Sequence, residues 1–382
     1  MTQTADVIIV GGGVIGCAIA YALAEKGTEV TVLERDRIGA HASSAAAGML
    51  GAQVEMSFPG PMLDLCLQSR ERYPLWQHRL LEQTGLDIEL REEGILRLAR
   101  TEEEVKALQE RENWQHRYGL NASWIEGEAL SLSEPSLSRE WLGGLHISGD
   151  GQVLAPRLVQ ALAQGVRVNG GSIEEGVDVH DVVTKGRRAT AVETNRGTFY
   201  GEMLVLSGGV WLSSLLSRLG MSLSVSPVKG ESIALRPQRP LFQRTLFGSE
   251  GVYLVPKRDG RVLVGATEKP GDTRPGVTAA GAAWLLQEAI RLVPALKEAE
   301  WIDAWSGFRP RTADGLPVLG PLSAWNNVFV AGGHFRNGIL LAPATGEGMA
   351  AWILGEKVPE WEAFSPERFQ KVAISEQGGG RP

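Results

Sequence analysis

Residues 6–35 read DVIIVGGGVIGCAIAYALAEKGTEVTVLER, and this stretch decides the fold of the chain. Residues 7–10 are all apolar, which is typical of a buried strand in a parallel sheet. Apolar residues then recur at helical spacing over residues 15–23, and Gly27 ends that helix. Polar and apolar residues alternate over residues 29–33, which predicts a second strand. The stretch therefore predicts a strand, a glycine turn, a helix and a second, parallel strand.

Three glycines and one acid in this stretch predict a dinucleotide site. Gly11, Gly13 and Gly16 have the spacing G-x-G-x-x-G, which allows a tight turn, close approach of a diphosphate and close packing of helix on strand. Glu34 lies 23 residues (34 − 11) after the first glycine, where a carboxylate can accept hydrogen bonds from the ribose of an adenine dinucleotide. The complete strand–helix–strand context disfavours a purely structural turn. It leaves nicotinamide and flavin cofactors both open.

Length and composition predict a globular protein with two domains. The 382 residues exceed what one hydrophobic core usually supports, and 43% hydrophobic and 22% charged residues are ordinary values. The net charge of −7, without a basic cluster, argues against a nucleic-acid partner. There is no run of 18 apolar residues to predict a membrane span, and no charged n-region precedes the opening apolar strand, so a signal peptide is not expected. With only two cysteines, Cys17 and Cys66, we expect a cytoplasmic protein.

Two further stretches are rich in small residues and predict contact with a flat ligand. Residues 43–49, SSAAAGM, can line a phosphate and a ring with backbone amides, although a plain loop into the next helix is the alternative. Residues 202–211 predict a buried strand that opens onto Ser207, Gly208 and Trp211.

The rest of the chain predicts a second sheet and further helices. Helices are expected at residues 61–84, 279–292 and 343–354, and strands dominate residues 225–304. Residues 376–382, which end in GGGRP, are expected to be frayed.

Seven segments together resemble the FAD-dependent amine and amino-acid oxidase superfamily, and within it the glycine oxidases most. The segments are VIIVGGGVIGCAIAYAL, SSAAAGMLGA, GILRLA, PVKGE, YLVPKRDGRVLVGATEKPGD, WSGFRPRTADGLPVLG and GHFRNGILLAPATG. The resemblance implies an α/β fold like that of D-amino-acid oxidase, with a Rossmann-like FAD-binding domain and an antiparallel-sheet substrate domain. The FAD-binding domain is expected over 1–85, 145–225 and 305–382, and the substrate domain over 86–144 and 226–304.

The same resemblance implies which residues bind FAD. We expect these contacts from Gly11, Gly13, Val14, Ile15, Gly16, Glu34, Arg35, Ser43, Ser44, Ala46, Ala47, Gly48, Met49, Val179, Ser207, Gly208, Trp211, His334, Phe335, Arg336, Asn337, Gly338, Ile339 and Leu340. Binding is expected to be non-covalent, because neither cysteine matches the position that carries FAD in monomeric sarcosine oxidases. The histidines show no metal-ligand spacing, so no metal is expected.

The resemblance also implies a site for an amino-acid carboxylate. Arg309 matches the family arginine that binds it as a planar two-pronged cation. Tyr253 is expected to add a phenol hydrogen bond, and Arg336 to be a second contact. Met49 is expected in the pocket, as is Glu268, which stands where glycine oxidases usually have methionine. An acid there must face solvent or pair with a cation, and Arg336 or Lys269 can provide one.

The implied activity is oxidation of glycine, sarcosine or D-alanine to an imine, which hydrolyses to a 2-oxo acid and ammonia or amine. Molecular oxygen is expected to become hydrogen peroxide, and the pathway to be synthesis of the thiamine thiazole. A homotetramer is expected by the same resemblance. Two alternatives stay open: a D-amino-acid or opine dehydrogenase with a different electron acceptor, and a flavin-binding subunit of a larger complex.

Overall fold

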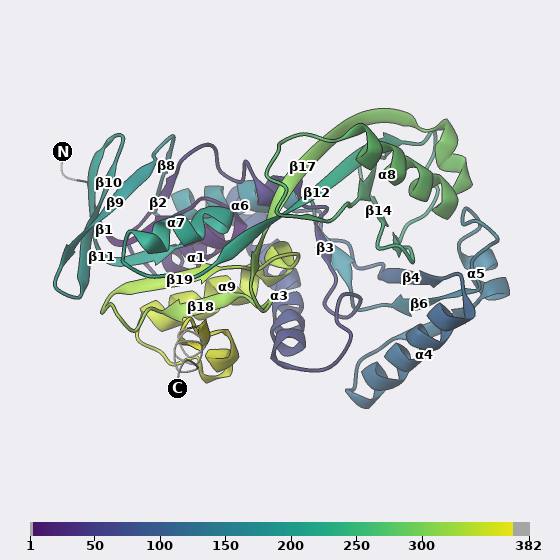
Figure 1. Cartoon of the computed structure of the whole chain (residues 1–382), viewed down its shortest axis with the longest axis horizontal. Helices are drawn as coiled ribbons and strands as arrows, with labels where there is room; N and C mark the ends of the chain where they lie inside the picture. Colours follow the sequence, from purple (N-terminus) through teal and green to yellow (C-terminus); the bar gives the residue numbers. More distant parts are fainter. Residues whose placement is uncertain (1–2, 370–382) are drawn as a thin grey trace, which may run out of the picture.

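Two large β-sheets lie side by side along the long axis of the molecule (Figure 1). The structure, a computed structural model, describes residues 3–369. Residues 376–382, which the sequence predicts to be frayed, lie outside the described part. Within residues 3–369, no helix is both long and apolar enough to cross a membrane.

The first sheet has eight strands and contains the N-terminal glycine unit. Its strands are β1 (Gln3–Val10), β2 (Val30–Glu34), β8 (Ser172–Glu175), β9 (Val179–Lys185), β10 (Arg188–Thr194), β11 (Gly197–Leu206), β18 (Val318–Pro321) and β19 (Val328–Gly332). Their order is β18-β19-β11-β1-β2-β8, and β10 and β9 extend from β11. The central strands β19, β11, β1, β2 and β8 are parallel, so the predicted Rossmann-like sheet is confirmed.

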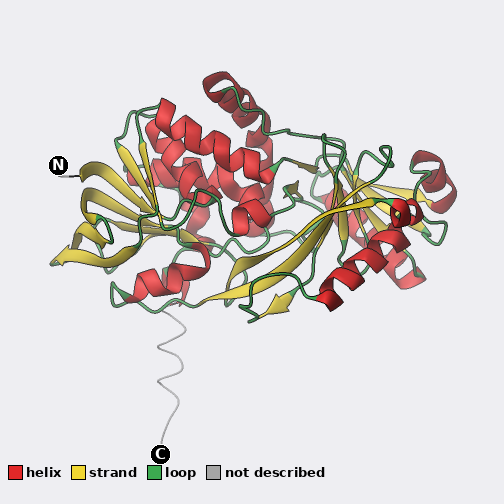
Figure 2. Cartoon of the chain, turned by 90° about the horizontal axis from the view of Figure 1, so that it is seen from above, coloured by secondary structure: helices red, strands yellow, loops and turns green. Residues whose placement is uncertain are grey.

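Both faces of strand β1 are buried, which explains its continuous apolar run. Val7 and Ile9 join one hydrophobic cluster and Ile8 and Val10 join another, because successive side chains point to opposite faces of the sheet. Figure 2 shows helices packed on the first sheet. The helices associated with these two clusters are α1 (Val14–Ala24), α3 (Pro61–Thr84), α6 (Ala155–Val168), α7 (Leu212–Ser217) and α9 (Gly338–Ile353).

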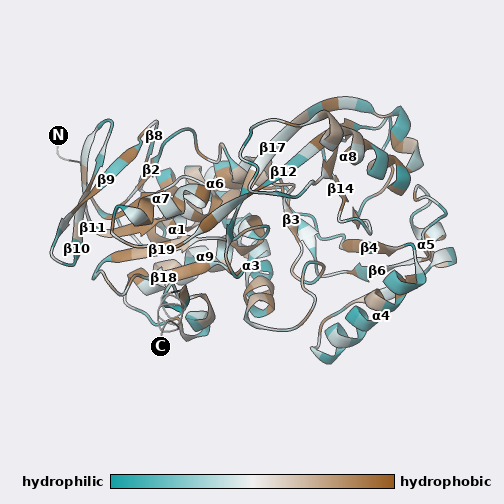
Figure 3. Ribbon diagram, viewed as in Figure 1, coloured by the Kyte–Doolittle hydropathy of each residue, from teal (hydrophilic) through white to brown (hydrophobic). Residues whose placement is uncertain are grey.

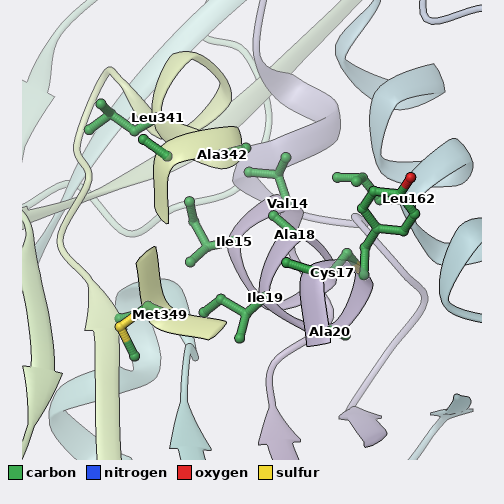
Figure 4. Close-up of a cluster of buried hydrophobic side chains, with 14 of the residues drawn as sticks. Val14, Ile15, Cys17, Ala18, Ile19, Ala20, Leu162, Leu341, Ala342 and Met349 are labelled. Atoms are coloured by element: carbon green, nitrogen blue, oxygen red, sulfur yellow. The ribbon is translucent and has the colours of Figure 1, made fainter. Parts of the chain in front are cut away.

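Helix α1 is the centre of the larger cluster. Every one of its residues is buried, and the helix contains no charged side chain. Figure 4 shows its side chains surrounded by residues of two other helices, Leu162 of α6 and Leu341, Ala342 and Met349 of α9. This packing fixes the N-terminal end of α1, and with it the glycine turn.

The second sheet has nine strands and is mainly antiparallel. Its strands are β4 (Ile95–Ala99), β5 (Ser123–Glu126), β6 (Gly143–Ile147), β12 (Val225–Arg236), β13 (Thr245–Phe247), β14 (Tyr253–Pro256), β15 (Val262–Gly265), β16 (Lys269–Pro270) and β17 (Glu300–Thr312). Their order is β16-β12-β15-β14-β13-β4-β6-β5, and β17 pairs with β12 along almost its whole length. Only β13 and β4 run parallel among these described strands.

Helices α4 (Glu102–Arg117), α5 (Gly127–Ser133) and α8 (Ala279–Leu292) accompany the second sheet. Thr101 caps α4 and forms a reciprocal capping box with Glu104. Figure 3 shows α4 as largely hydrophilic, as its run of glutamates predicts. The remaining elements are α2 (Ala42–Ala45), β3 (Met49–Leu50), which pairs with β7 (Gly151–Gln152), and the short 3₁₀ helices η1 (Gly209–Trp211), η2 (Pro294–Glu298) and η3 (Pro359–Phe364).

The predicted start of the last helix at Pro343 is wrong. Helix α9 begins at Gly338 and contains Pro343 in its interior. A proline there cannot donate to the carbonyl of Ile339, four residues earlier. The hydroxyl of Tyr73 on α3 donates to that carbonyl instead, so the helix continues through the proline.

Candidate functional site

Two adjoining hollows lie against the glycine turn. The first has about 1180 Å³ of empty space and the second about 840 Å³, each including space open to solvent. Six residues line both hollows: Gly13, Ala42, Ser43, Ser207, Gly209 and Phe308. The hollows therefore form one elongated site that begins at β2 and ends under the second sheet.

The glycine turn packs too closely for side chains. Gly11 has φ +112°, and a Cβ there would lie 2.6 Å from the carbonyl oxygen of Ser207. A Cβ on Gly16 would overlap the Gly11 carbonyl oxygen. Gly11 lines the second hollow and Gly13 lines both, whereas Gly16 lines neither and serves the packing of α1 on β1.

The start of α1 offers hydrogen-bond donors to the hollows. Of the amides of Gly13, Val14 and Ile15, only that of Val14 has an acceptor within residues 3–369, the Ser43 hydroxyl at 2.9 Å. The Glu34 carboxylate accepts from the amides of Gly12 at 2.7 Å and Asp36 at 2.9 Å, one on each oxygen. Each oxygen keeps a lone pair for a further donor. Free amides beside a helix N-terminus suit a diphosphate, and the carboxylate suits ribose hydroxyls.

The second hollow is also lined by Val179 and by a cluster of Arg35, His41 and Trp211. The guanidinium of Arg35 lies 4.3 Å from the centre of the Trp211 ring, and the His41 ring lies 4.7 Å from it. His41 also lies 2.7 Å from a carboxylate oxygen of Asp36. Glu34, Asp36 and His41 are close enough to hold a metal ion, but His41 and Asp36 already pair with each other and Glu34 already accepts two amide hydrogen bonds.

The first hollow is lined by two backbone segments. One includes Ala46, Ala47, Gly48 and Met49, and the other runs from His334 to Ile339. Burial lowers the pKa of His334 to about 3, and its Nε2 lies 3.1 Å from the Thr345 hydroxyl. His334 is therefore a neutral imidazole at physiological pH.

A single row of side chains crosses the second sheet above the first hollow. Residues that pair directly on neighbouring strands project to the same face, and here the pairing is continuous from β4 to β17. The row is Arg97, Phe247, Tyr253, Gly265, Ser232 and Trp305. Tyr253 and Ser232 line the hollow, and the indole N–H of Trp305 donates to the Ala45 carbonyl at 3.0 Å. This row, here called the ceiling row, faces Ala45 at the end of α2.

Arg309 lies beside the ceiling row with most of its donors uncommitted. Its guanidinium packs against Gly230, where a Cβ would lie 2.6 Å from its nitrogens. Within residues 3–369 its side chain makes one hydrogen bond, to the Thr267 carbonyl at 3.3 Å. The Tyr253 hydroxyl has no partner among the same residues, and both side chains line the first hollow. Together they can bind an anion.

The PVKGE segment, residues 227–231, supports Arg309 from behind. Glu231 and Lys229 are buried, and the Glu231 carboxylate lies 3.2 Å from the Lys229 ammonium and 2.7 Å from that of Lys269. Burial alone would raise the pKa of Glu231, but hydrogen bonds from Lys269, Thr278 and Lys229 lower it to about 2. The Glu231 amide donates to the Thr267 hydroxyl at 2.9 Å, which fixes the residue whose carbonyl holds Arg309.

Arg336 has acidic partners on two sides. Glu55 lies 3.0 Å from its Nε, and Glu268 lies 3.3 Å from its Nη1. The nearby Glu55 carboxylate raises the pKa of Arg336. The expected cation for Glu268 is thus Arg336, whereas Lys269 binds Glu231. Glu268 is 42% exposed and lies at the edge of the site, not among the residues that line it.

Most residues predicted from the sequence line one hollow or the other, including Met49, Gly208, Phe335, Asn337 and Gly338. Besides Gly16 and Glu268, Ser44 and Leu340 do not: Ser44 is exposed, and Leu340 is buried in the core around α1. Glu55 and Phe308 also line the first hollow but are not predicted from the sequence. Phe308 is adjacent to Arg309 in a segment that the resemblance already includes, but Glu55 had no local signal.

Comparisons with known proteins place the chain in a family. The family model described as FAD dependent oxidoreductase matches residues 6–352. The chain belongs to this family. Among the FAD dependent oxidoreductases it resembles, the glycine oxidase of Geobacillus kaustophilus (strain HTA426) is 46% identical over 348 residues, which cover 91% of this chain and 92% of that protein.

Three further comparisons extend this result. The bifunctional protein ThiO/ThiG of Synechocystis is 42% identical over 377 residues, which cover 97% of this chain but 55% of that protein. The crystal structure of glycine oxidase from Geobacillus kaustophilus superposes with a TM-score of 0.93 at 43% identity, and covers 95% of this chain and 98% of that one. The L-proline dehydrogenase from P. horikoshii, at 22% identity and a TM-score of 0.88, shares the fold.

The residues of this FAD dependent oxidoreductase fit the cofactor of its family. The joined hollows accommodate an elongated molecule, with the Glu34 carboxylate at one end and the small residues Ala46, Ala47 and Gly48 at the other. The free amides at the start of α1 lie between these ends. Cys17 and Cys66 are buried in the core and line neither hollow, so neither offers a thiol for a covalent link.

Proposed function

We propose that this enzyme oxidises glycine, together with sarcosine and D-alanine, to an imine that hydrolyses to a 2-oxo acid and ammonia or amine. Bound FAD would supply the two-electron chemistry, as the acceptor of hydride from the substrate Cα and the donor of two electrons to oxygen, which would give hydrogen peroxide. The observation that carries this proposal is the pair of Arg309 and Tyr253, which face the first hollow with uncommitted donors. The glycine oxidases at 46% and 36% identity support the same substrate class.

The proposed task of Arg309 is to hold the substrate carboxylate through two parallel hydrogen bonds. Tyr253 donates a third hydrogen bond to that carboxylate. Arg336 is a weaker candidate for binding the carboxylate, because it already forms ion pairs with Glu55 and Glu268. With its carboxylate fixed at the second sheet, a small amino acid extends towards the loop at Ala47 and Gly48. Met49 and Ser232 then limit the space for a side chain.

No residue in the first hollow is needed as a general base. His334 is the nearest conventional candidate, but it is buried and neutral with one ring nitrogen beside Thr345. Hydride departure from a neutral amine leaves an iminium, which loses its proton readily without a fixed acceptor. We therefore assign His334 and the residues up to Ile339 to cofactor contact.

Peroxide production tests this proposal. The purified protein, supplemented with FAD, is assayed with glycine, sarcosine and D-alanine for oxygen uptake, peroxide and 2-oxo acid, with L-alanine as the control. We expect peroxide and oxo acid in equal amounts. Flavin reduction by glycine without peroxide in air would identify a dehydrogenase instead. Failure of every amino acid to reduce the bound flavin would refute the substrate class.

The pathway and assembly belong to the same proposal. Alignment of 97% of this chain with bifunctional ThiO/ThiG proteins supports a role in supplying an imine or glyoxylate for the thiazole of thiamine. We also propose a cytoplasmic homotetramer. Its mass in solution, measured by light scattering after size exclusion, distinguishes a tetramer from a monomer of 41.2 kDa.

A further inference from the structure

Lys257 is a buried lysine whose three oxygen partners include the carbonyl of Ala47, a residue that lines the first hollow. It directly follows β14, and its side chain is 6% exposed. Its ammonium donates to the carbonyl of Ala47 at 2.8 Å, the carbonyl of Val153 at 3.0 Å and the side-chain oxygen of Gln152 at 2.8 Å. Lys257 is not among the residues that line the hollow. It therefore reaches the hollow only through the residues that it binds.

The three oxygens favour the charged form of Lys257. Burial lowers the pKa of its ammonium to about 7. A neutral amine has two N–H groups and a lone pair, so it would turn that lone pair towards one of the three oxygens. An ammonium has three N–H groups and satisfies all three. The surrounding geometry is thus built for a positive charge.

The Ala47–Gly48 peptide connects this charge to the hollow. Gly48 has φ +86°, and a Cβ there would overlap the Val153 carbonyl oxygen, so its backbone is fixed on that side. The Gly48 carbonyl accepts from the Val153 amide at 2.8 Å. The Gly48 amide, by contrast, has no acceptor within residues 3–369. In a trans peptide the N–H points opposite to the C=O, so it points away from Lys257 and towards the hollow that Gly48 lines.

We propose that Lys257 is a positioning residue that raises the reduction potential of the bound flavin through the Ala47–Gly48 peptide. A charged donor on a carbonyl polarises the whole peptide group and strengthens its N–H as a donor. A stronger donor beside the ring stabilises the more electron-rich reduced flavin, as does the buried positive charge behind it. The inference rests on FAD binding, which the family establishes, and is independent of which amino acid is the substrate.

The test measures the midpoint potential of bound FAD in wild type, Lys257→Met and Lys257→Arg, by equilibration with a reference dye and without amino acid. We expect Lys257→Met to shift the reduction equilibrium at least tenfold towards oxidised flavin, about 30 mV for two electrons. Its absorbance spectrum should change as well, and FAD should dissociate more readily. Lys257→Arg should recover most of the shift because it keeps the charge.

Lys229→Met is the matched control. Lys229 is as deeply buried in the same sheet, but its ammonium reaches Glu231 and Asp272 and not the loop at Ala47. This variant should lose stability and keep the wild-type potential. If Lys257→Met does not retain FAD, Lys257→Gln carries the test, because its amide can still donate to Ala47 while the charge is absent. An equilibrium within threefold of wild type in the variant that retains FAD, or an equal shift in Lys229→Met, would overturn the proposal.

Discussion

Replacing Arg309 tests the proposed carboxylate site most directly. The guanidinium lines the first hollow, packs on Gly230 and donates one hydrogen bond to the Thr267 carbonyl. Truncation to alanine removes the one described donor to that carbonyl, and with it the only cation lining the hollow that no described acid binds. Arg336 cannot substitute, because Glu55 and Glu268 flank it.

The size of the effect follows from this geometry. Loss of one charged partner from a buried, hydrogen-bonded ion pair costs about 2 to 5 kcal/mol. At about 1.4 kcal/mol per factor of ten, Arg309→Ala should lower kcat/KM for glycine by about 30-fold to several thousand-fold. Arg309→Lys should lose less, because it keeps a point charge but not the two-pronged geometry.

Steady-state oxygen uptake with glycine provides the measurement, with FAD content determined from the flavin absorbance. Arg236→Ala is the control, since Arg236 is an exposed residue at the end of β12, which pairs with β17. FAD content should be the same in all variants. A change in kcat/KM below about threefold, well under 1 kcal/mol, would show that Arg309 does not bind the carboxylate.

Three further outcomes are expected. Tyr253→Phe should raise the KM for glycine about 10- to 100-fold, the value of one hydrogen bond to a charged group, with unchanged FAD content. An unaltered KM would show that Tyr253 does not bind the carboxylate. Glu268→Met should improve the KM for iminodiacetate, which carries a second carboxylate, about two- to fivefold at low salt, because the exposed Glu268 charge is worth about 0.5 to 1 kcal/mol. The gain should vanish at high salt while kcat for glycine stays constant, and a salt-independent gain would contradict an electrostatic cause. The pKa of Glu231 falls from 4.5 to about 2 on folding, so its ionised carboxylate stabilises the folded protein. This contribution is complete above pH 4.5 and is lost as the pH falls towards 2. Glu231→Gln should therefore be less stable than wild type at pH 7 by about 3 to 5 kcal/mol in thermal or urea unfolding, and the difference should shrink on acidification; a constant difference would exclude the carboxylate charge as its source.

The N-terminal unit was predictable because its signals are local. Gly11, Gly13 and Gly16 act within one turn, and the apolar residues of β1 and α1 recur at periods that a short window contains. Helices α3 and α8 begin and end where periodicity and terminal residues predict, at 61–84 and 279–292. Such features need no knowledge of distant contacts.

The contacts around Arg336 were only partly predictable. Glu55 binds Arg336, although the two residues are 281 positions apart in the sequence. No local pattern near either residue predicts this contact. Glu268 attracted attention only as a departure from a familiar motif. The interior position of Pro343 in α9 is a similar case, since it depends on the Tyr73 hydroxyl from another helix. Long-range polar partners of this kind arise from the tertiary arrangement and not from local preference.

The ceiling row offers a compact set of positions for redesign of substrate choice. Its six residues come from six strands, yet each is the direct neighbour of the next, so a library at two or three of them would sample one continuous wall. Gly265 is closed to such variation, because a Cβ there would press on the Tyr253 ring. Phe247 and Ser232 flank this fixed pair and have side chains that can be shortened or exchanged. Exchanges at Ser232 would change the lining of the first hollow directly, whereas exchanges at Phe247 would act on it through the Tyr253 ring, against which Phe247 packs.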